Sequence, residues 1–583
     1  MMMKRVLSLL LAVVLLMGSA AGCGQKDAGG DTRAAGTDAV TTAEQKPEGS
    51  VAGTEAAEAE AADPLGKYEE PVKVMMINQL SDDMSKQLET IGETVDDNRW
   101  IKRYKDRLNI DIEHLWVAKP EAYTEKFNLM LVSGDLPDIL KVNAVQFRQL
   151  LEAGMLEDLT DVYNTYMNED YKKVAESDPY MMASSTFESR IMGIPTEPTK
   201  PYSNTQQIWI RSDWLEKLNL PEPKTMDDVI ELARKFMEAK PDGVDTYGIA
   251  FDKDSFSPAA ATIPGFPGFA NSYHAYPDIW IESEAGSLTY GSLAPEVKNA
   301  LESMRALYEE GIIDKEFATK DATQYNQDLI SGKVGITYNW LGFALSINDM
   351  KKLNPEAEFT AYEIVSVDEE EALPQANATV DFWYVVRKGY EHPEALIKMA
   401  NLEIATLITS EAKDQAPDGT TNSEYYGAPK DAPSMFDVVN FWFSLVPDEN
   451  STRYDVYEAV VKRDPSTVRS NDLSIYENLI AYEEGDLAQW GWNRTFGGPG
   501  GGAEITQKYK AENKLKVNAY FGLPTETMTE RQATLNQLQA ETFTKIVMGE
   551  VGLEAFDEFT EKWLALGGQD ITDEVNEWYE ANK

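Results

Sequence analysis

Residues 72–78 read VKVMMIN and residues 110–116 read IDIEHLW, two short, mostly apolar runs of the kind that form β-strands. Between them, residues 95–108 (VDDNRWIKRYKDRL) have the pattern of an amphipathic helix. A strand, a helix and a second strand in this order form a unit whose two strands pair in parallel. The same alternation continues along the chain, and the sequence therefore predicts an α/β fold.

Helices farther along the chain have recognisable ends and apolar faces. Thr225 is placed to cap a helix, with Asp228 in the first turn. Apolar residues then recur at helical spacing, here and near the C-terminus: Val229, Leu232, Ala233 and Phe236; Phe556, Phe559 and Trp563; Ile571, Val575 and Trp578. We expect these faces, tryptophans included, to pack in the core.

The charge of the chain excludes several partners. Its 583 residues include 53 Lys and Arg against 99 Asp and Glu, which gives a formal charge of −46. Such a polyanion repels phosphate backbones, and no local basic stripe compensates, so no nucleic acid partner is expected. The length allows several domains or two large lobes.

The N-terminus has the pattern of a secretory signal. Lys4 and Arg5 precede an apolar run over Val6–Met17, and small residues then lead to Cys23, the only cysteine of the chain. Residues 23–65 are rich in Ala, Gly, Thr and Glu and poor in large apolar residues, which predicts a disordered tether. No later run of 18 apolar residues suggests a membrane span.

Motifs for catalysis are missing from the sequence. Its three histidines, His114, His274 and His392, are far apart, and neither G-x-S-x-G nor H-E-x-x-H occurs. The glycine cluster at residues 496–502 lacks the Gly-Lys-Ser/Thr of a phosphate loop. Among 99 acidic residues a carboxylate pair suited to glycoside hydrolysis could exist, but no pair is singled out. We expect no enzyme activity, no catalytic residues and no cofactor.

Residues 240–248 (KPDGVDTYG) resemble a shortened calcium loop. A loop of the EF-hand type needs oxygen ligands at alternate positions over about a dozen residues, and this segment is too short. Lys240 and Val244 also stand where oxygen ligands would be needed. An ordinary Asp-Gly turn is the alternative, and no metal site is predicted.

Several segments, taken in order, resemble the extracellular solute-binding proteins of bacterial ABC importers, in particular sugar-binding family 1 and its large lipoprotein branch. They are SGDLPDI (133–139), AGMLEDL (153–159), IWIRSDWLEKL (208–218) with 221–225, SGKVGI (331–336) with Trp340, HPEA (392–395), and the tail from 566 to 579. Each segment alone is a weak signal, whereas their order is more specific. Together they cover most of residues 70–583.

The resemblance implies an α/β fold of the periplasmic-binding-protein type, with two lobes, each a mainly parallel sheet flanked by helices, and hinge crossings between them. The expected organisation is a lipoprotein signal peptide (1–22), the tether (23–65), lobe 1 (66–207 and 379–450) and lobe 2 (208–378 and 451–583). Cys23 would carry the lipid, with palmitate as an acyl chain. The protein would then be a monomer anchored to the cell membrane and facing the extracellular side.

The resemblance also suggests ligand-binding residues. By similarity to maltose-binding proteins, Asp138 would accept sugar hydroxyls and Trp340 would stack on a sugar ring, while Arg211 could donate to ligand oxygens. Asp138 could instead be a turn residue after Pro137. Four further tryptophans are candidates for stacking, with core packing as an equal alternative: Trp280, Trp383, Trp490 and Trp492.

The expected function is capture of an oligosaccharide in a cleft between the lobes and its delivery to the permease subunits of an ABC importer. A cationic oligopeptide is an alternative ligand for so acidic a body. A secreted polysaccharide hydrolase or lyase and an envelope scaffold lipoprotein are the alternatives from other classes.

Overall fold

Strand β1 (Val72–Gln79) pairs in parallel with β2 (Ile110–Ala118), and helices α1 (Asp82–Thr90) and α2 (Arg99–Leu108) connect them. Both strands and their parallel pairing confirm the sequence prediction. Helix α2 begins later than predicted because the Asn98 side chain accepts a hydrogen bond from the Ile101 N–H and caps it.

The computed structural model describes residues 63–258, 265–409, 438–469 and 472–583, which belong to one structural unit. The predicted signal peptide, Cys23 and the tether up to residue 62 lie outside the described residues. At the start of the described part, the Pro64 carbonyl already accepts a hydrogen bond from the Asn401 side chain.

A second sheet shares its hydrophobic core with β1 and β2. Strand β14 (Trp383–Val386) lies between β3 (Ile139–Val142) and β6 (Ile194–Pro195) and is antiparallel to both. Helices α3 (Pro120–Ser133), α4 (Ala144–Glu152) and α15 (Glu394–Glu403) contribute to the cores around these strands. Those cores use residues 72–194 and 380–445, with Leu523 as the one addition from the C-terminal part.

A four-stranded sheet organises the other large cores. Its order is β12 (Phe359–Tyr362), β7 (Gln206–Arg211), β11 (Val334–Trp340) and β8 (Tyr247–Ala250). Helices α8 (Ser212–Leu218), α9 (Met226–Ala239), α11 (Pro295–Glu310) and α12 (Ala322–Ile330) contribute to the cores around it. Those cores use residues 208–372 and 456–575.

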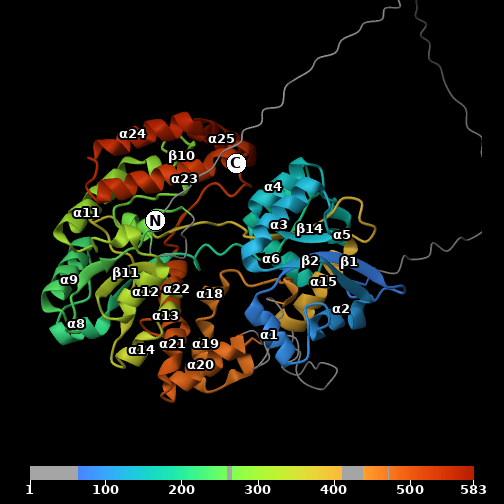
Figure 1. Cartoon of the computed structure of the whole chain (residues 1–583), viewed down its shortest axis with the longest axis horizontal. Helices are drawn as coiled ribbons and strands as arrows, with labels where there is room; N and C mark the ends of the chain where they lie inside the picture. The colour runs from blue at the N-terminus through green and yellow to red at the C-terminus, as the bar shows by residue number, and fades with distance from the viewer. Residues whose placement is uncertain (1–62, 259–264, 410–437, 470–471) are drawn as a thin grey trace, which may run out of the picture. The chain divides into compact units, whose positions relative to one another are not determined.

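The predicted helix caps and faces are present. Thr225 and Asp228 form a reciprocal capping box at the start of α9, and the four predicted apolar residues of that helix are buried. The C-terminal faces are buried in α24 (Glu554–Trp563) and α25 (Gln569–Asn582), except that Trp578 is half-buried. Figure 1 shows these helices in red, and α23 (Glu526–Val547) packs against α11.

The two-lobe α/β fold class is confirmed, but the prediction of mainly parallel sheets is wrong. In the four-stranded sheet only β8 and β11 are parallel, and both pairings of β14 are antiparallel. The connections explain the difference. Strand β6 carries the chain out of its sheet towards the four-stranded sheet and β14 carries it back, so the two neighbouring strands run in opposite directions.

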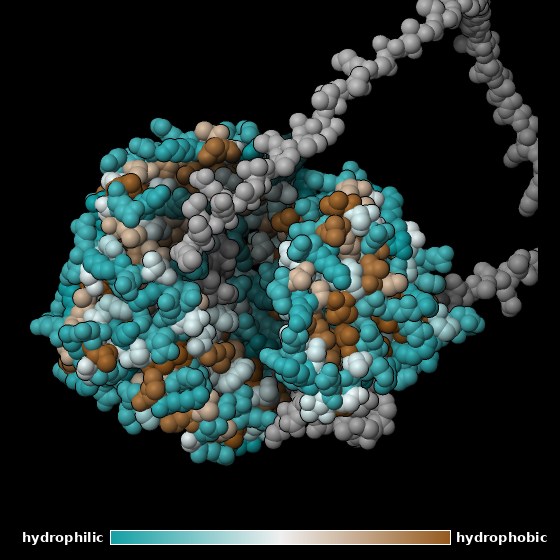
Figure 2. Space-filling view, in the orientation of Figure 1, coloured by the Kyte–Doolittle hydropathy of each residue, from teal (hydrophilic) through white to brown (hydrophobic). Residues whose placement is uncertain are grey.

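The remaining elements are short or lie outside the main sheets. They are α5 (Thr160–Tyr166), α6 (Glu169–Ser177), α7 (Pro179–Ala183), β4 (Thr186–Phe187), β5 (Arg190–Ile191), α10 (Phe266–Asn271), β9 (Trp280–Glu282), β10 (Leu288–Tyr290), α13 (Phe343–Ser346), α14 (Met350–Leu353), β13 (Gln375–Ala376), α18 (Glu449–Thr452), α19 (Asp455–Lys462), α20 (Leu473–Glu483), α21 (Trp490–Phe496), α22 (Gly502–Glu512) and β15 (Lys516–Val517). Across the described ranges, no helix combines the length and the apolar character needed to cross a bilayer. The face seen in Figure 2 is mostly hydrophilic.

Candidate functional site

Residues 375–382 (QANATVDF), here called the crossing segment, lead from the cores of the four-stranded sheet back to β14. Its side chains alternate: Ala376, Ala378 and Val380 are buried, whereas the intervening polar residues up to Asp381 are partly or fully exposed. In an extended chain, successive side chains point to opposite sides. One side of the crossing segment therefore anchors it, and the other presents a row of polar groups.

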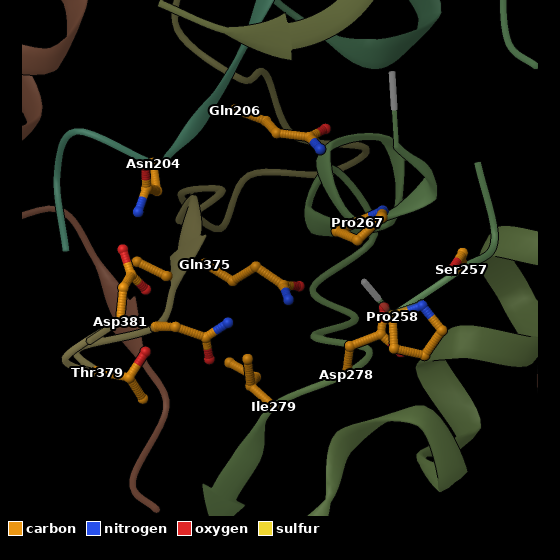
Figure 3. Close-up of a pocket in the computed structure, with 12 residues that line it drawn as sticks. Asn204, Gln206, Ser257, Pro258, Pro267, Asp278, Ile279, Gln375, Thr379 and Asp381 are labelled. Carbon is orange, nitrogen blue, oxygen red and sulfur yellow. The ribbon is translucent and has the colours of Figure 1, made fainter. Parts of the chain in front are cut away.

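That polar row forms one wall of a pocket of about 130 Å³, here called the crossing pocket. It is lined by Asn204, Gln206, Ser257, Pro258, Pro267, Asp278, Ile279, Gln375, Ala376, Asn377, Thr379 and Asp381. Figure 3 shows Asn204, Thr379 and Asp381 on one side and Ser257, Pro258 and Asp278 on the other. Amides, carboxylates and hydroxyls dominate this lining, which suits a ligand rich in hydroxyl groups.

Some of these polar side chains form hydrogen bonds within the protein. The Gln206 side chain accepts a hydrogen bond from the Gly268 N–H at 3.0 Å, and the Gln375 side chain accepts one from the Asn271 amide at 2.8 Å. In contrast, no hydrogen bond joins the side chains of Asn204, Thr379 or Asp381 to another residue in the described part of the chain. These three polar groups are free to bind a ligand.

Asp278 has a different environment on the opposite wall. Burial raises the pKa of its carboxyl group to about 6, although the Gln539 amide and the Ser292 hydroxyl donate hydrogen bonds to it at 2.6 and 3.1 Å. Its role is therefore to tie α23 to the wall of the pocket.

The crossing pocket lies at the carboxyl ends of parallel strands. Ser257 and Pro258 belong to the connection that follows β8, and Gln206 pairs with Trp340, the last residue of β11. Ligands of open α/β sheets bind outside these strand ends. Both the position of the crossing pocket and the polar groups that line it therefore favour a ligand-binding site.

A second pocket, of about 400 Å³, occupies the equivalent position on β1 and β2 and is here called the strand-end pocket. Gln79 is the last residue of β1, and Pro120 begins α3 two residues after the end of β2. The other lining residues are Ser81, Met84, Lys141, Asn440 and Trp442. The Tyr384 hydroxyl holds the turn that carries Trp442, because it donates to the Asn440 carbonyl and accepts from the Trp442 N–H.

Aromatic side chains lie where the crossing segment meets the strand-end pocket. Phe382 follows Asp381 and leaves 39% of its surface exposed. Lys141 lies over the Phe382 ring, and Lys200 lies 5.7 Å from the centroid of Trp442. A flat ring beside free polar groups is the combination that binds sugar rings, whose C–H faces are apolar.

The crossing pocket continues into a groove with aromatic walls, here called the aromatic groove. It consists of two pockets of about 360 and 540 Å³, which share Ser184, Tyr520, Phe521, Gly522 and Leu523. The smaller one also shares Thr379 and Asp381 with the crossing pocket. A continuous surface therefore runs from the crossing segment to the residues around Trp578 on α25.

The structure places Asp138 away from these pockets. It precedes β3, whereas Lys141 of the strand-end pocket lies three residues later, about 10 Å along the strand. Its carboxylate accepts hydrogen bonds from the Met75 N–H at 2.8 Å and from Arg387 at 2.7 Å. These contacts join β1, β3 and β14, so Asp138 has a structural role, and its contact with sugar hydroxyls stays a prediction.

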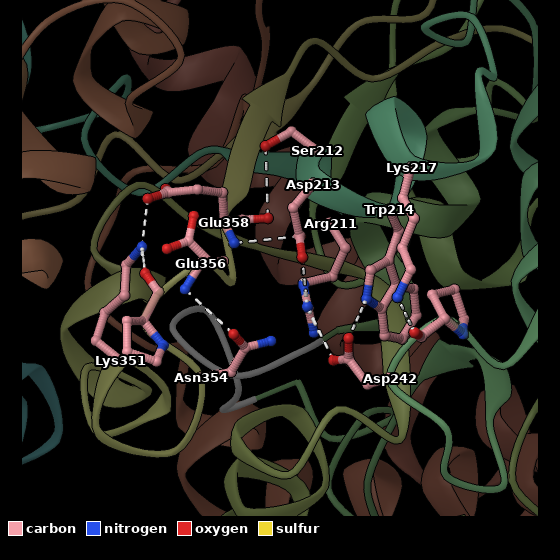
Figure 4. Close-up of polar contacts among 12 residues, drawn as sticks. Arg211, Ser212, Asp213, Trp214, Lys217, Asp242, Lys351, Asn354, Glu356 and Glu358 are labelled. Carbon is pink, nitrogen blue, oxygen red and sulfur yellow. Dashed lines mark hydrogen bonds and ion pairs between the residues drawn. The ribbon is translucent and has the colours of Figure 1, made fainter.

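Arg211 is fully buried and does not reach a pocket. Its guanidinium group donates two hydrogen bonds to Asp213 and one to Asp242, as Figure 4 shows. It also lies 4.4 Å from the Trp214 ring centroid. Arg211 ends β7, about 17 Å along the strand from Gln206. The predicted contact with ligand oxygens is therefore replaced by an internal ion-pair network.

Three of the predicted tryptophans pack in cores. Trp280 contacts Tyr290, Trp383 contacts Phe147 and donates a hydrogen bond to Ser184, and Trp490 donates one to Glu358. All three are buried, which favours the alternative of core packing. Trp383 still forms part of the floor of the aromatic groove.

Trp340 and Trp492 are the predicted residues that keep accessible ring surface. Both are partly buried and pack against the same core cluster. Trp340 is also in register with Gln206 of the crossing pocket. Their role as stacking residues stays a prediction.

The loop at residues 240–248 is held by ion pairs. Asp242 binds Arg211 and accepts a hydrogen bond from the Trp214 indole, and Lys240 pairs with Asp245 at 2.6 Å. Among the described residues, no group of three or more His, Cys, Asp or Glu side chains is arranged to hold a metal ion.

Sequence reasoning missed Asn204, Thr379, Asp381, Phe382 and Trp442. The alternation of small apolar and polar residues at 375–382 was the available signal for the first wall of the pocket. No comparable signal marks Trp442, since its position depends on the contact of its turn with Tyr384.

Comparison with known proteins identifies relatives of this architecture. Residues 95–413 match the family described as bacterial extracellular solute-binding protein. Lipoprotein LipO of Bacillus subtilis is 24% identical over 502 residues, which are 81% of this chain and 87% of LipO. The polygalacturonan/rhamnogalacturonan-binding protein YtcQ of B. subtilis is 30% identical over 259 residues, 43% of this chain and 48% of YtcQ.

A solved structure supports the fold. The crystal structure of an extracellular solute-binding protein from Bifidobacterium longum subsp. infantis superimposes with a TM-score of 0.60 at 18% identity, covering 88% of this chain and 98% of that one.

Proposed function

Since the chain belongs to the bacterial extracellular solute-binding proteins, we propose that it captures an oligosaccharide along the crossing pocket, the strand-end pocket and the adjoining aromatic groove and delivers it to an ABC importer. The observation that carries this proposal is the juxtaposition of free polar side chains and an exposed aromatic ring on one short segment. Asp381 and Phe382 are adjacent, and both are exposed.

The chemistry of the proposed contacts is complementary to a neutral sugar. Asp381 accepts hydrogen bonds from ligand hydroxyls, while Asn204 and Thr379 can donate or accept. The Phe382 and Trp442 rings pack against apolar C–H faces, and Trp340 and Trp492 extend the stacking surface. The crossing pocket alone, at about 130 Å³, is smaller than the roughly 300–1,000 Å³ of typical ligand pockets, so the ligand extends into the pockets beside it.

Ligand binding would then be coupled to a change of conformation. The two pockets are built on separate hydrophobic cores, joined through the crossing segment and the connection from β6 to β7. A ligand that contacts both strand ends stabilises conformations in which they approach each other. The permease of the importer recognises that ligand-bound form, and no bond of the sugar is broken.

Cys23 anchors the protein in this proposal. Lipid, palmitate included, on this cysteine and the tether that follows keep the binding body near the permease at the outer face of the cell membrane. The similarity to a lipoprotein over most of the chain supports the anchor. Cys23→Ser should release the protein into the medium and abolish incorporation of labelled palmitate, whereas retention of both would refute the anchor.

Thermal unfolding of the purified protein against a panel of oligosaccharides and short peptides tests the function. A ligand that binds the native state raises the midpoint by mass action. We expect a saturable rise with one class of glycan and recovery of that glycan unchanged by sugar analysis. Products of cleavage would instead indicate a hydrolase or lyase, and silence of the whole panel would refute ligand capture.

A cationic oligopeptide is the second candidate ligand. The aromatic groove favours it, because Glu526 and Glu577 accompany Tyr520, Phe521 and Trp578 there. Carboxylates and aromatic faces both attract ammonium and guanidinium groups. Lysine-rich tetrapeptides in the panel distinguish this ligand from a sugar.

A further inference from the structure

The lining of the crossing pocket and the aromatic groove has one sign of charge. Its acidic residues are Asp278, Asp381, Glu188, Glu526, Glu574 and Glu577. Among the described lining residues of these pockets, Arg148 is the only lysine or arginine. We propose that this surface selects oligosaccharides without carboxylate groups and rejects uronate oligosaccharides, an inference that rests on the proposed function.

The acidic residues differ in how far the fold neutralises them. Glu188 pairs with Arg190 at 2.7 Å, and Glu574 accepts a hydrogen bond from the Thr527 hydroxyl at 2.7 Å. The carboxylates of Asp381, Glu526 and Glu577, in contrast, have no hydrogen bond or ion pair with another residue of the described chain. Three uncompensated negative charges therefore face the groove.

The nearby cations are already engaged. Arg148 donates a hydrogen bond to Glu152, its partner one helical turn later on α4. In the strand-end pocket, Lys141 lies over the Phe382 ring, and burial lowers its pKa. Lys200 pairs with Glu197. Among the described lining residues, the guanidinium group, which recognises a carboxylate with two parallel hydrogen bonds, occurs only in Arg148, where it already pairs with Glu152.

A uronate ligand would meet two penalties at this surface. Its carboxylates would be repelled by the free carboxylates of Asp381, Glu526 and Glu577, and these groups, being acceptors, cannot donate hydrogen bonds to them. A neutral glycan presents hydroxyl donors to the same acceptors. YtcQ is named as a binding protein for polygalacturonan and rhamnogalacturonan, which contain uronates, so the proposed ligand class of this chain differs from that of YtcQ. Less than half of YtcQ aligns with this chain.

The test compares two matched series by titration calorimetry at low salt. One consists of neutral tetrasaccharides of glucose, galactose, mannose and fructose, together with fully methyl-esterified tetragalacturonate. The other consists of tetragalacturonate, tetramannuronate and C6-oxidised forms of the neutral members. We expect a neutral member to bind at least about 30-fold more tightly than its charged counterpart, with a smaller ratio at 0.5 M salt because the repulsion is screened.

A double variant separates charge from shape. In Glu526→Gln with Glu577→Gln, the ratio of neutral to charged affinity should fall at least about fivefold. A control with equal change of charge, Glu89→Gln with Glu296→Gln on exposed helix positions away from the groove, should keep the ratio. A ratio that is unchanged in the double variant overturns the proposal.

The remaining outcomes separate this inference from the function it rests on. Binding of tetragalacturonate or tetramannuronate as tightly as any neutral member overturns the charge selectivity and leaves sugar capture standing. Silence of both series refutes sugar capture itself and the selectivity with it.

Discussion

The ammonium nitrogen of Lys141 lies 4.6 Å from the centroid of the Phe382 ring. This contact joins β3 to the end of the crossing segment, and it holds the ring in place while more than a third of its surface stays exposed. Phe382 therefore lies between the crossing pocket, lined by its neighbour Asp381, and the strand-end pocket, lined by Lys141.

Phe382→Ala should weaken glycan binding by about 10- to 100-fold, because a stacked aromatic contact contributes about 1–3 kcal/mol with its buried area. Titration calorimetry measures the loss. The midpoint of thermal unfolding without ligand should change little. Leu129→Ala on α3, which removes a more exposed apolar side chain, is the matched control and should keep full affinity. Unchanged affinity in Phe382→Ala would exclude the ring from the site.

Thr379→Ala and Asn204→Ala should each weaken binding by about 3- to 15-fold, the effect of losing one hydrogen bond of roughly 0.5–1.5 kcal/mol. Neither substitution leaves a hydrogen-bonding group of the protein without its partner, so the free energy of unfolding should be preserved. Thr165→Ala, an exposed threonine on α5, serves as the control. Equal affinities in all three variants would remove the polar row from the site.

Arg103 and Glu403 form a buried ion pair beside the core that β1, β2 and β14 share. The Arg103 guanidinium lies 2.7 Å from the Glu403 carboxylate, and both side chains are fully buried. Arg103→Met leaves a buried carboxylate without its partner and should lower the free energy of unfolding by about 3–5 kcal/mol. Arg103→Met with Glu403→Leu should cost less, as urea denaturation measures. A double variant less stable than the single one would contradict this interpretation.

The buried carboxyl group of Glu197 should make the free energy of unfolding depend on pH. The residue lies in the connection between β6 and β7, and burial raises its pKa to about 7 even though Lys200 pairs with it. The unfolded chain has a glutamate pKa near 4.3, so between about pH 4 and pH 7 the folded state binds more protons. The free energy of unfolding therefore falls as pH rises through this range, by about 4 kcal/mol from this group.

Glu197→Gln removes that dependence. Its free energy of unfolding, measured by urea denaturation from pH 4 to pH 8, should fall less steeply with pH than that of the unchanged protein. Asp278, with its pKa also raised by burial, titrates in both proteins and cancels from the comparison. Parallel pH profiles would show that Glu197 ionises normally in the folded state.

Local pattern was sufficient to predict much of the fold. Alternating apolar runs identified β1 and β2, and the side chains of Thr225 and Asp228 form the capping box expected of them. Strand direction was harder to predict from the sequence, because β14 pairs with strands that are about 190 to 240 residues away in the chain. The register of Trp383 with Pro195 and Val142 shows these separations. Short-range periodicity carries no information about such partners.

The candidate site was harder to predict because residue type does not reveal burial. Trp383 and Phe382 are adjacent, yet one ring is buried against Phe147 and the other is exposed, since successive side chains of an extended segment point to opposite sides. Arg211 was predicted to donate to ligand oxygens, whereas its guanidinium group is buried and pairs with Asp213 and Asp242. The alternation at the crossing segment was a better guide than the number of tryptophans.

A crystal structure of the protein with the glycan that raises its unfolding midpoint tests the central claim most directly. We predict an intact oligosaccharide within hydrogen-bond distance of Asn204, Thr379 and Asp381, with a sugar ring on Phe382 or Trp442. A glycan bound elsewhere, with the crossing segment empty, would contradict the assigned site, and a cleaved glycan would contradict the proposal that the protein only binds.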